Sequence, residues 1–432
     1  MSTPFGRPMR EHFLFEEGNI NINHGSFGTY PKPVLDALRS YQLQGEANPD
    51  RFLRYEVSEL IDRSREQLAK LLHVVDVDEL VLVQNATTGV NTVLRNLTYA
   101  PGDKILYLST AYGACEKTVD YLTETTPAEA VRVEVAYPIS DDELVARVEK
   151  VLKENAPVKV AMFDTVSSLP GVRIPFERLV AVCRAAGVLS LIDGAHGVGC
   201  IPLDLGKLDA DFFVSNCHKW LYVPRGCAVL HVPKRNQDLI RSSMPTSHGY
   251  QPRERPGKKK ISNPLPPSTK SGFVRMFEFI GSMDYAPYLC VPAALKFRQE
   301  VCGGEEAIMS YCTQVARDGS RRVAEILGTE VMRHDQPCPV VNVRLPIDPP
   351  AGDVTAAAAQ ARIGAVNAFV EKMMLSEYKT FVPAFFHNGR FWVRLSGQIY
   401  LTVDDFEEVG RQLRDICSRV GRTSHLTELE DK

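Results

Sequence analysis

The sequence has few of the features that mark membrane, secreted or nucleic-acid-binding proteins. It contains no run of about 18 apolar residues, which excludes a helix that spans a membrane. Its 50 basic and 53 acidic residues leave a net charge of −3, so it lacks the positive excess with which proteins hold nucleic acid. Residues 1–17 lack the apolar core of a secretory signal. We therefore expect a cytoplasmic protein that binds neither membrane nor nucleic acid.

Paired cysteine motifs are also missing. The chain has ten cysteines, but none forms a CxxC pair and none shows the Cys/His spacing of a metal site. In a long chain without a secretory signal, scattered cysteines are typical of free buried thiols rather than of disulfides. We expect neither a bound metal nor a disulfide framework.

What the sequence does contain is a repeated alternation of helical stretches and short apolar runs between residues 58 and 232. Seven of these runs have the composition and length of strands. They cover residues 79–84, 104–108, 131–136, 158–163, 188–192, 211–214 and 226–232. Strands separated by helices predict an α/β fold with a mainly parallel seven-stranded sheet that is buried on both faces.

The pattern changes after residue 240. Residues 241–275 are rich in proline and, over 253–260, in basic residues, which predicts either a solvated loop or a lid over an acidic substrate. Beyond this loop the spacing of apolar residues predicts a smaller α+β domain. Its helices are expected at 300–327, 356–374 and 403–417, and its strands at 340–345, 381–385 and 391–395.

Polar residues stand where the predicted strands end, and in a parallel sheet ligands bind at that edge. The turn at 85–91 opens a helix whose free N–H groups, with the hydroxyls of Thr87 and Thr88, suit a phosphate or serve as an ordinary cap. Asp193 closes an apolar strand, where a carboxylate needs a cationic or hydrogen-bonding partner. It therefore either caps the next turn or binds a ligand.

Two basic residues complete this set. Lys219 follows the strand at 211–214, where it is either an ordinary surface lysine or a desolvated amine that attacks carbonyl groups. Arg394 lies inside an apolar strand and needs an anion, either an internal carboxylate or that of a substrate. The four features provide a phosphate site, a carboxylate for a ring nitrogen, a reactive lysine and a carboxylate-binding arginine. Pyridoxal 5'-phosphate (PLP) requires this combination.

Two segments carry a resemblance to known enzymes. Asp193-Gly-Ala-His196 and Ser215-Asn-Cys-His-Lys219 occur in the order and spacing of fold-type I PLP-dependent enzymes. Over residues 20–420 the chain resembles the class V aminotransferase and cysteine desulfurase group of that fold. The resemblance implies a set of cofactor contacts, which comprises Thr87, Thr88, Ser168, Asp193, His196, Asn216, His218, Lys219 and Ser282.

The same resemblance implies a division of the chain and an assembly. It places an N-terminal segment that contributes to the active site at 1–55, a large PLP-binding domain at 56–298 and a small C-terminal domain at 299–432. Residues 277–282 are similar to the segment through which a partner subunit reaches the phosphate, with Ser282 where the family usually has threonine. A homodimer with an active site shared between subunits is therefore implied.

Six further segments are similar to isopenicillin N epimerase-like proteins, and especially to the fungal C–S lyases of ergothioneine biosynthesis, which act on hercynylcysteine sulfoxide. These segments are residues 23–28, 52–55, 112–115, 166–171, 245–249 and 390–394. In those lyases the tyrosine that matches Tyr112 is implicated as an acid or base toward the sulfur leaving group. The chain departs from them at His196, where they have glutamine, and is shorter around residues 345–365. It also has no cysteine between Cys338 and Arg394, where a cysteine desulfurase carries its persulfide.

The resemblance implies that Lys219 forms a Schiff base with PLP and then moves the Cα proton of a small amino-acid substrate. Asp193 keeps the pyridine nitrogen protonated, and Arg394 binds the α-carboxylate. On a cysteine-conjugate sulfoxide, C–S cleavage follows and gives pyruvate and ammonia. Three residues are candidates to face the substrate side chain, or else to cap loops and form ion pairs: His24, Arg54 and His248.

Other outcomes stay open at this point. The same carbanion serves an epimerase, or a carbon–carbon bond-forming cyclase of a fungal secondary-metabolite pathway of the alkaloid type. A non-catalytic protein that keeps the PLP fold only for binding is a further alternative. The presence of both Lys219 and Asp193 disfavours that last alternative.

Overall fold

Two β-sheets organise the chain. The computed structural model describes residues 3–253, 256–257, 261, 263–350 and 355–420. The larger sheet has seven strands in the order β1-β7-β6-β5-β4-β2-β3. Its strands are β1 (Leu80–Val83), β2 (Lys104–Leu108), β3 (Glu129–Val133), β4 (Val158–Asp164), β5 (Leu189–Asp193), β6 (Phe212–Asn216) and β7 (Ala228–His231).

This sheet confirms the predicted α/β fold. The neighbours from β3 through β6 run parallel, and only β7 runs antiparallel to both β6 and β1. Successive residues of β1 enter different hydrophobic clusters, with Leu80 and Leu82 on one face and Val81 and Val83 on the other. Both faces are therefore buried, which explains the continuous apolar runs in the sequence. β3 begins two residues before the predicted run at 131–136.

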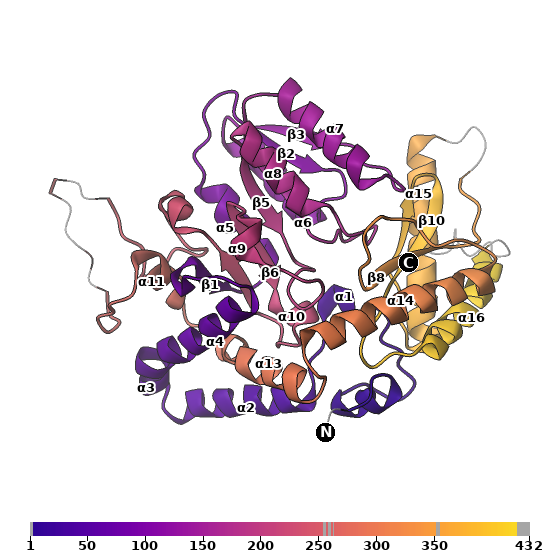
Figure 1. Ribbon diagram of the computed structural model, residues 1–432, viewed down its shortest axis with the longest axis horizontal. Helices are drawn as coiled ribbons and strands as arrows, with labels where there is room; N and C mark the ends of the chain where they lie inside the picture. Colours follow the sequence, from indigo (N-terminus) through magenta and orange to yellow (C-terminus); the bar gives the residue numbers. More distant parts are fainter. Residues whose placement is uncertain (1–2, 254–255, 258–260, 262, 351–354, 421–432) are drawn as a thin grey trace.

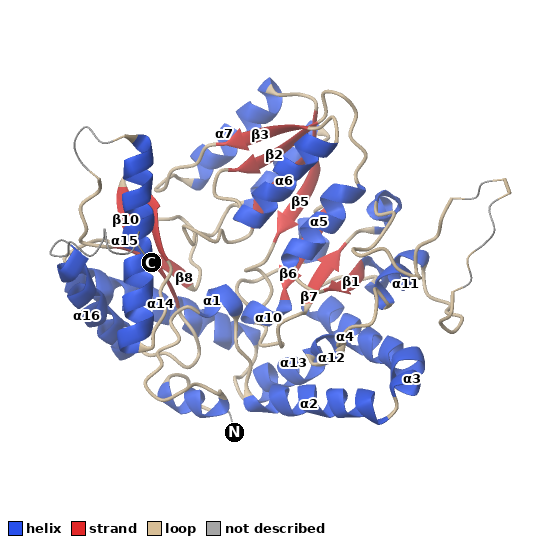
Figure 2. Cartoon of the chain, turned by 180° about the vertical axis from the view of Figure 1, so that it is seen from behind, coloured by secondary structure: helices blue, strands red, loops and turns tan. Residues whose placement is uncertain are grey.

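Helices cover both faces of the sheet (Figures 1 and 2). α5 and α6 contribute to the cluster on one face, and α4, α7 and α8 to the cluster on the other. The helices of this part are α1 (His24–Phe27), α2 (Lys32–Ala47), α3 (Pro49–Arg51), α4 (Val57–Leu71), α5 (Ala86–Asn96), α6 (Gly113–Thr125), α7 (Asp141–Glu154), α8 (Phe176–Ala186), α9 (Leu205–Leu208), α10 (Cys217–Trp220), α11 (Gly272–Glu278), α12 (Ala286–Leu289) and α13 (Val291–Glu300). Short 3-10 or π turns lie at Arg7–His12, Phe52–Glu56, Val77–Glu79 and Lys234–Leu239.

The C-terminal part is the smaller α+β unit that the sequence predicts. Its antiparallel sheet has the order β8-β10-β9. Its elements are α14 (Glu305–Leu327), β8 (Val340–Arg344), α15 (Ala356–Tyr378), β9 (Ala384–His387), β10 (Arg390–Ser396) and α16 (Val403–Val420).

Two predicted boundaries in this unit were wrong. The helix expected from residue 300 begins at Glu305, because Gly303 and Gly304 adopt positive φ angles of 80° and 98° that end the preceding helix. The strand expected at 381–385 is Ala384–His387, since Pro383 has no N–H to donate to a ladder.

The N-terminal segment touches both parts. Met9, Phe13 and Ile22 are buried in the hydrophobic core of the C-terminal unit, whereas α2 packs on α12 and α13, beneath the large sheet in Figure 1. The segment therefore bridges the two cores. The domain boundaries expected after residues 55 and 298 stay a prediction.

Several other expectations concern single features. All ten cysteines are buried and free. Within the described ranges, no helix is long and apolar enough to cross a membrane. Of the predicted basic loop at 253–260, residues 254–255 and 258–260 lie outside the described residues, as does residue 262.

Gly28 joins the N-terminal segment to the large sheet and allows one stability prediction. Its φ of 64° and ψ of 172° belong to a region that is essentially restricted to glycine. A Cβ atom there would lie 1.9 Å from the carbonyl oxygen of His218 and 2.8 Å from the Cα of Lys219. We expect Gly28→Ala to lower the free energy of unfolding by about 2–4 kcal/mol in denaturant titrations.

The matched control is Gly364→Ala. Gly364 lies in α15, and a Cβ added there meets nothing within 4 Å. Alanine has the better helix propensity, so this change should leave stability unchanged or raise it by up to about 1 kcal/mol. Equal losses in both variants would contradict the close approach at Gly28.

Candidate active site

The carboxyl ends of three neighbouring strands meet at one edge of the large sheet. Asp164 ends β4, Asp193 ends β5 and Asn216 ends β6. Asp164 and Asp193 are direct partners in the parallel register. Lys219 follows at once on the short helix α10, so the end of β6 carries it to the same edge.

Asp193 is a buried carboxylate that accepts one backbone N–H and one thiol S–H. Only 3% of its surface is exposed. Its Oδ1 accepts the N–H of Ala195 at 3.0 Å, and its Oδ2 accepts the S–H of Cys115 at 3.3 Å. Burial raises the pKa of Asp193 despite these donors and the charge of Lys219. The pKa of Asp164 is raised well above its usual range by burial and by Asp193 beside it. A cation placed here would relieve this repulsion.

Lys219 is half-buried beside these carboxylates. Its Nζ lies 3.1 Å from Nε2 of His196. Burial lowers the pKa of Lys219 to about 8, and the positive charge of Arg394 acts in the same direction, against the opposing charges of Asp193 and Asp164. With this pKa about a tenth of the amine is uncharged at pH 7, far more than for an ordinary lysine, and the uncharged form is the nucleophile.

Arg394 is buried and has no anionic partner among the residues that the structure describes. The exposed fraction of Arg394 on β10 is 2%. Its Nη1 donates to the carbonyl of Ser168 at 2.8 Å, and its Nη2 donates to Asn23 Oδ1 at 2.9 Å and to Ser26 Oγ at 2.7 Å. All these acceptors are neutral, and its Nε has no hydrogen-bond partner among the described residues. Burial lowers the pKa of Arg394 to about 10. The internal salt bridge that the sequence left open is absent from the described residues, so an external anion suits this guanidinium.

The N-terminus of α5 lies beside the same strand end. Asn85 caps the helix by accepting the N–H of Thr88 at 2.8 Å. Asn216 at the end of β6 accepts the N–H of Ala86 at 2.8 Å, which ties the strand to the helix. Thr87 and Thr88 stand half-buried in the first turn. The positive end of the helix dipole favours an anion at this position.

Three histidines of the site are neutral. Burial lowers the pKa of His24 to about 3 and that of His218 to about 4. His24 Nε2 donates to the carbonyl of Lys219 at 2.6 Å and its Nδ1 accepts the hydroxyl of Tyr400 at 2.9 Å, so both ring nitrogens are engaged. Burial and two neighbouring cations hold the pKa of His196 well below its usual range.

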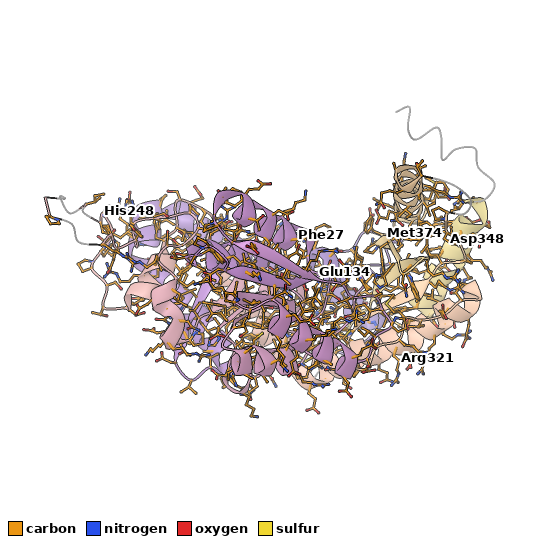
Figure 3. All side chains as sticks on the ribbon, turned by 90° about the horizontal axis from the view of Figure 1, so that it is seen from above. Phe27, Glu134, His248, Arg321, Asp348 and Met374 are labelled. Atoms are coloured by element: carbon orange, nitrogen blue, oxygen red, sulfur yellow. The ribbon has the colours of Figure 1, made fainter. Side chains whose placement is uncertain are left out.

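Four predicted site residues are either exposed to solvent or bound to partners other than Lys219. Tyr112 precedes α6 and is 48% exposed, and Ser282 is also exposed. Arg54 pairs with Asp50 at 2.8 Å and donates to the carbonyl of Pro264. The ring of His248 stacks on Phe279, toward the end of the molecule away from Phe27 in Figure 3. In the described residues, none of these four side chains forms a hydrogen bond, ion pair or ring contact with Lys219, His196 or Arg394.

Sequence reasoning missed other polar groups at this edge. They are Asn23, Ser26, Cys115, Asp164 and Trp220. Asp164 carries the signal that revealed Asp193, since it too closes an apolar strand. No local signal connects Asn23 and Ser26 with Arg394, because about 370 residues separate them in the sequence.

The chain is similar to a known family of enzymes over most of its length. Residues 27–343 match the aminotransferase class-V family. The chain belongs to this family. Relatives of the chain include the L-cysteine desulfhydrase-like protein lolT1 of Epichloe uncinata, which is 38% identical over 96% of this chain and 97% of the relative. Hercynylcysteine sulfoxide lyase of Schizosaccharomyces pombe is 30% identical over 96% of this chain and 98% of the relative.

Solved structures share the fold of this chain. A lysine-to-alanine mutant of C-DES, with glycine covalently linked to its PLP cofactor, superposes with a TM-score of 0.73. The two chains are 18% identical, and the match covers 94% of this chain and 99% of that one. The resemblance and the fold predicted from the sequence are thus confirmed.

Proposed function

We propose that this class-V protein is a PLP-dependent enzyme. The observation that carries the proposal is the half-buried amine of Lys219 beside the buried carboxylate of Asp193. This donor set fits PLP, because a protonated pyridine nitrogen would add a cation, besides Lys219, next to the buried carboxylate of Asp193. The first turn of α5 suits its phosphate. When bound, PLP supplies a ring that withdraws the electron pair left at Cα.

Each residue of the proposed active site then has a defined role. Lys219 would hold the cofactor through its Nζ and, when the amino group of the substrate takes its place there, would serve as the base for the Cα proton. Arg394 binds the α-carboxylate with its forked N–H groups. Asp193 holds the proton on the ring nitrogen. The remaining cofactor contacts in this proposal are Thr87, Thr88, Ser168, His196, Asn216, His218 and, from a partner subunit, Ser282.

We further propose that the reaction is C–S cleavage of a cysteine-conjugate sulfoxide. The names of the two relatives, a desulfhydrase-like protein and a sulfoxide lyase, support this reaction class. After Lys219 removes the Cα proton, the Cβ–S electron pair leaves with the sulfur, which Tyr112 protonates. The remaining three-carbon fragment is hydrolysed to pyruvate and ammonia. Tyr112 is 48% exposed beside α6, and an exposed phenol is open to a substrate.

The test is an assay of pyruvate with a cysteine-conjugate sulfoxide as substrate. Stoichiometric pyruvate and ammonia are the expected products of the purified chain. Exchange of solvent deuterium into Cα without pyruvate would overturn C–S cleavage in favour of an epimerase or a cyclase. A chain that binds no PLP at all would overturn the whole proposal.

The lowered pKa of Lys219 predicts how the cofactor-free chain reacts with PLP. Only the uncharged amine attacks the aldehyde, so the rate should rise about tenfold per pH unit below pH 8 and level off above it. Stopped-flow absorbance between pH 6 and about pH 10 measures this dependence. A rate that still rises steeply toward pH 10, as for an ordinary lysine, would contradict the lowered pKa.

We also propose a cytoplasmic homodimer. Ser282 is exposed, and Arg54 and His248 have partners other than Lys219 within one chain, so a site shared between subunits gives them a place at the site of the partner. Sedimentation of the PLP-loaded protein tests this assembly, and a monomer with full activity would contradict it. Ten buried free thiols agree with a reducing compartment, which fractionation of the source cells tests.

A further inference from the structure

Trp220 and His196 form a hydrogen-bonded chain that ends at Lys219. The indole N–H of Trp220 donates to Nδ1 of His196 at 3.1 Å. On the other side of the same imidazole, Nε2 lies 3.1 Å from Nζ of Lys219. Both rings are buried, with exposed fractions of 1% for Trp220 and 2% for His196.

The chemistry of these groups determines where the imidazole proton sits. An indole N–H is only a donor, so Nδ1 of His196 must present its lone pair to Trp220. The imidazole is neutral, because burial and the charges of Lys219 and Arg394 disfavour a second proton. A neutral imidazole carries one N–H, which must then be on Nε2. That N–H faces Lys219.

Packing holds the imidazole in this orientation. A Cβ atom on Gly25 would lie 3.3 Å from Cε1 of His196 and 3.3 Å from Cζ2 of Trp220, so the backbone of α1 closes over both rings. The ring centroid of His24, which precedes Gly25 in α1, lies 5.3 Å from that of Trp220. His24 is itself anchored on the carbonyl of Lys219 at 2.6 Å. These contacts and the hydrogen bond between Trp220 and His196 restrict rotation of both rings.

We propose that Trp220 is a positioning residue that fixes the tautomer of His196, so that Nε2–H donates to the uncharged amine of Lys219. An ammonium group has no lone pair to accept this N–H, so the arrangement favours the nucleophilic form of Lys219. The effect belongs to the chain itself and exists without a cofactor. Its value for catalysis rests on the proposed function, because an uncharged amine is the form that attacks an aldehyde.

Other groups act on Lys219 and stay in place when Trp220 is changed. Arg394 on β10 disfavours the ammonium, whereas Asp193 on β5 and Asp164 on β4 favour it. Besides His196, the other ionisable groups around it are Cys115, Cys200, His24 and His218. The last two are neutral. A change in Lys219 after substitution of Trp220 therefore reports on His196.

The test measures the apparent pKa of Lys219 in the full-length, cofactor-free chain. Competitive acetylation with trace reagent across a pH series, read by mass spectrometry of the Lys219 peptide, gives this value. In Trp220→Phe, Nδ1 of His196 is free to take the proton, and Nε2 then accepts from the ammonium. We expect the pKa of Lys219 to rise by roughly one unit, the size of one hydrogen bond.

A double-mutant cycle separates this role from packing. His196→Ala removes the donor, so it should raise the pKa of Lys219 by a similar amount, and Trp220→Phe should add nothing in that background. Trp392→Phe is the matched control, because it removes another indole N–H, bonded to the carbonyl of His387 at 3.2 Å. It should leave Lys219 unchanged.

Three results would overturn the proposal. They are an unshifted Lys219 in Trp220→Phe, a shift of equal size in the His196→Ala background, or an unshifted Lys219 in His196→Ala. The last of these remains measurable if the tryptophan variant does not fold. None of them depends on PLP, so a chain with the predicted shifts that fails to bind PLP would contradict the proposed function alone.

Discussion

Replacing Lys219 with alanine is expected to abolish turnover and the covalent attachment of PLP together. The lysine is at once the group that bonds the cofactor and the base that moves the Cα proton. Loss of a positioned base alone costs about 10²–10⁴-fold in rate. Since the covalent function is lost as well, we expect kcat to fall by at least about 10³-fold.

Borohydride reduction followed by peptide mapping measures the attachment directly. The unchanged chain should carry the reduced cofactor on the Lys219 peptide, and Lys219→Ala should carry none. The control is Lys207→Ala, because the side chain of Lys207 in α9 is 89% exposed and should matter little to either readout. Cofactor fixed on another lysine of the Lys219→Ala chain would contradict the assigned attachment site.

Hydrophobic patterning was enough to predict the large sheet. Residues buried on both faces leave continuous apolar runs, and each of the seven runs became a strand within a few residues. The parallel arrangement then explains why residues as distant as Asp193 and Lys219 meet at one edge. Boundaries were less reliable where a glycine or proline acted, as at Gly304 and Pro383.

Contacts between distant segments could not be predicted from the sequence. Asn23 and Ser26 matter because the N-terminal segment passes over β10, and no periodicity encodes that path. The hydrogen bond from Trp220 to His196 joins helix α10 to the turn that follows β5, 24 residues earlier, and its meaning depends on which ring nitrogen faces which partner. Such geometry follows from tertiary packing, which local propensities do not determine.

The second large effect is expected at Arg394. Its guanidinium is buried, and its neutral partners leave the charge uncompensated within the described residues. Arg394→Lys keeps the positive charge but loses the planar fork that matches a carboxylate. We expect kcat/KM for an amino-acid substrate to fall by about 10²–10³-fold, equivalent to about 3–4 kcal/mol.

A substrate analogue without the α-carboxylate tells binding of that group apart from a general disturbance of the site. For such an amine, the unchanged enzyme already lacks the interaction, so Arg394→Lys should lower kcat/KM by little more than about threefold. Arg390→Lys is the control on the same strand, because Arg390 is exposed at the start of β10. It should leave both substrates unaffected. If Arg394→Lys impaired the amine as strongly as the amino acid, the guanidinium would instead act by holding Asn23 and Ser26 in place, and the carboxylate would bind elsewhere.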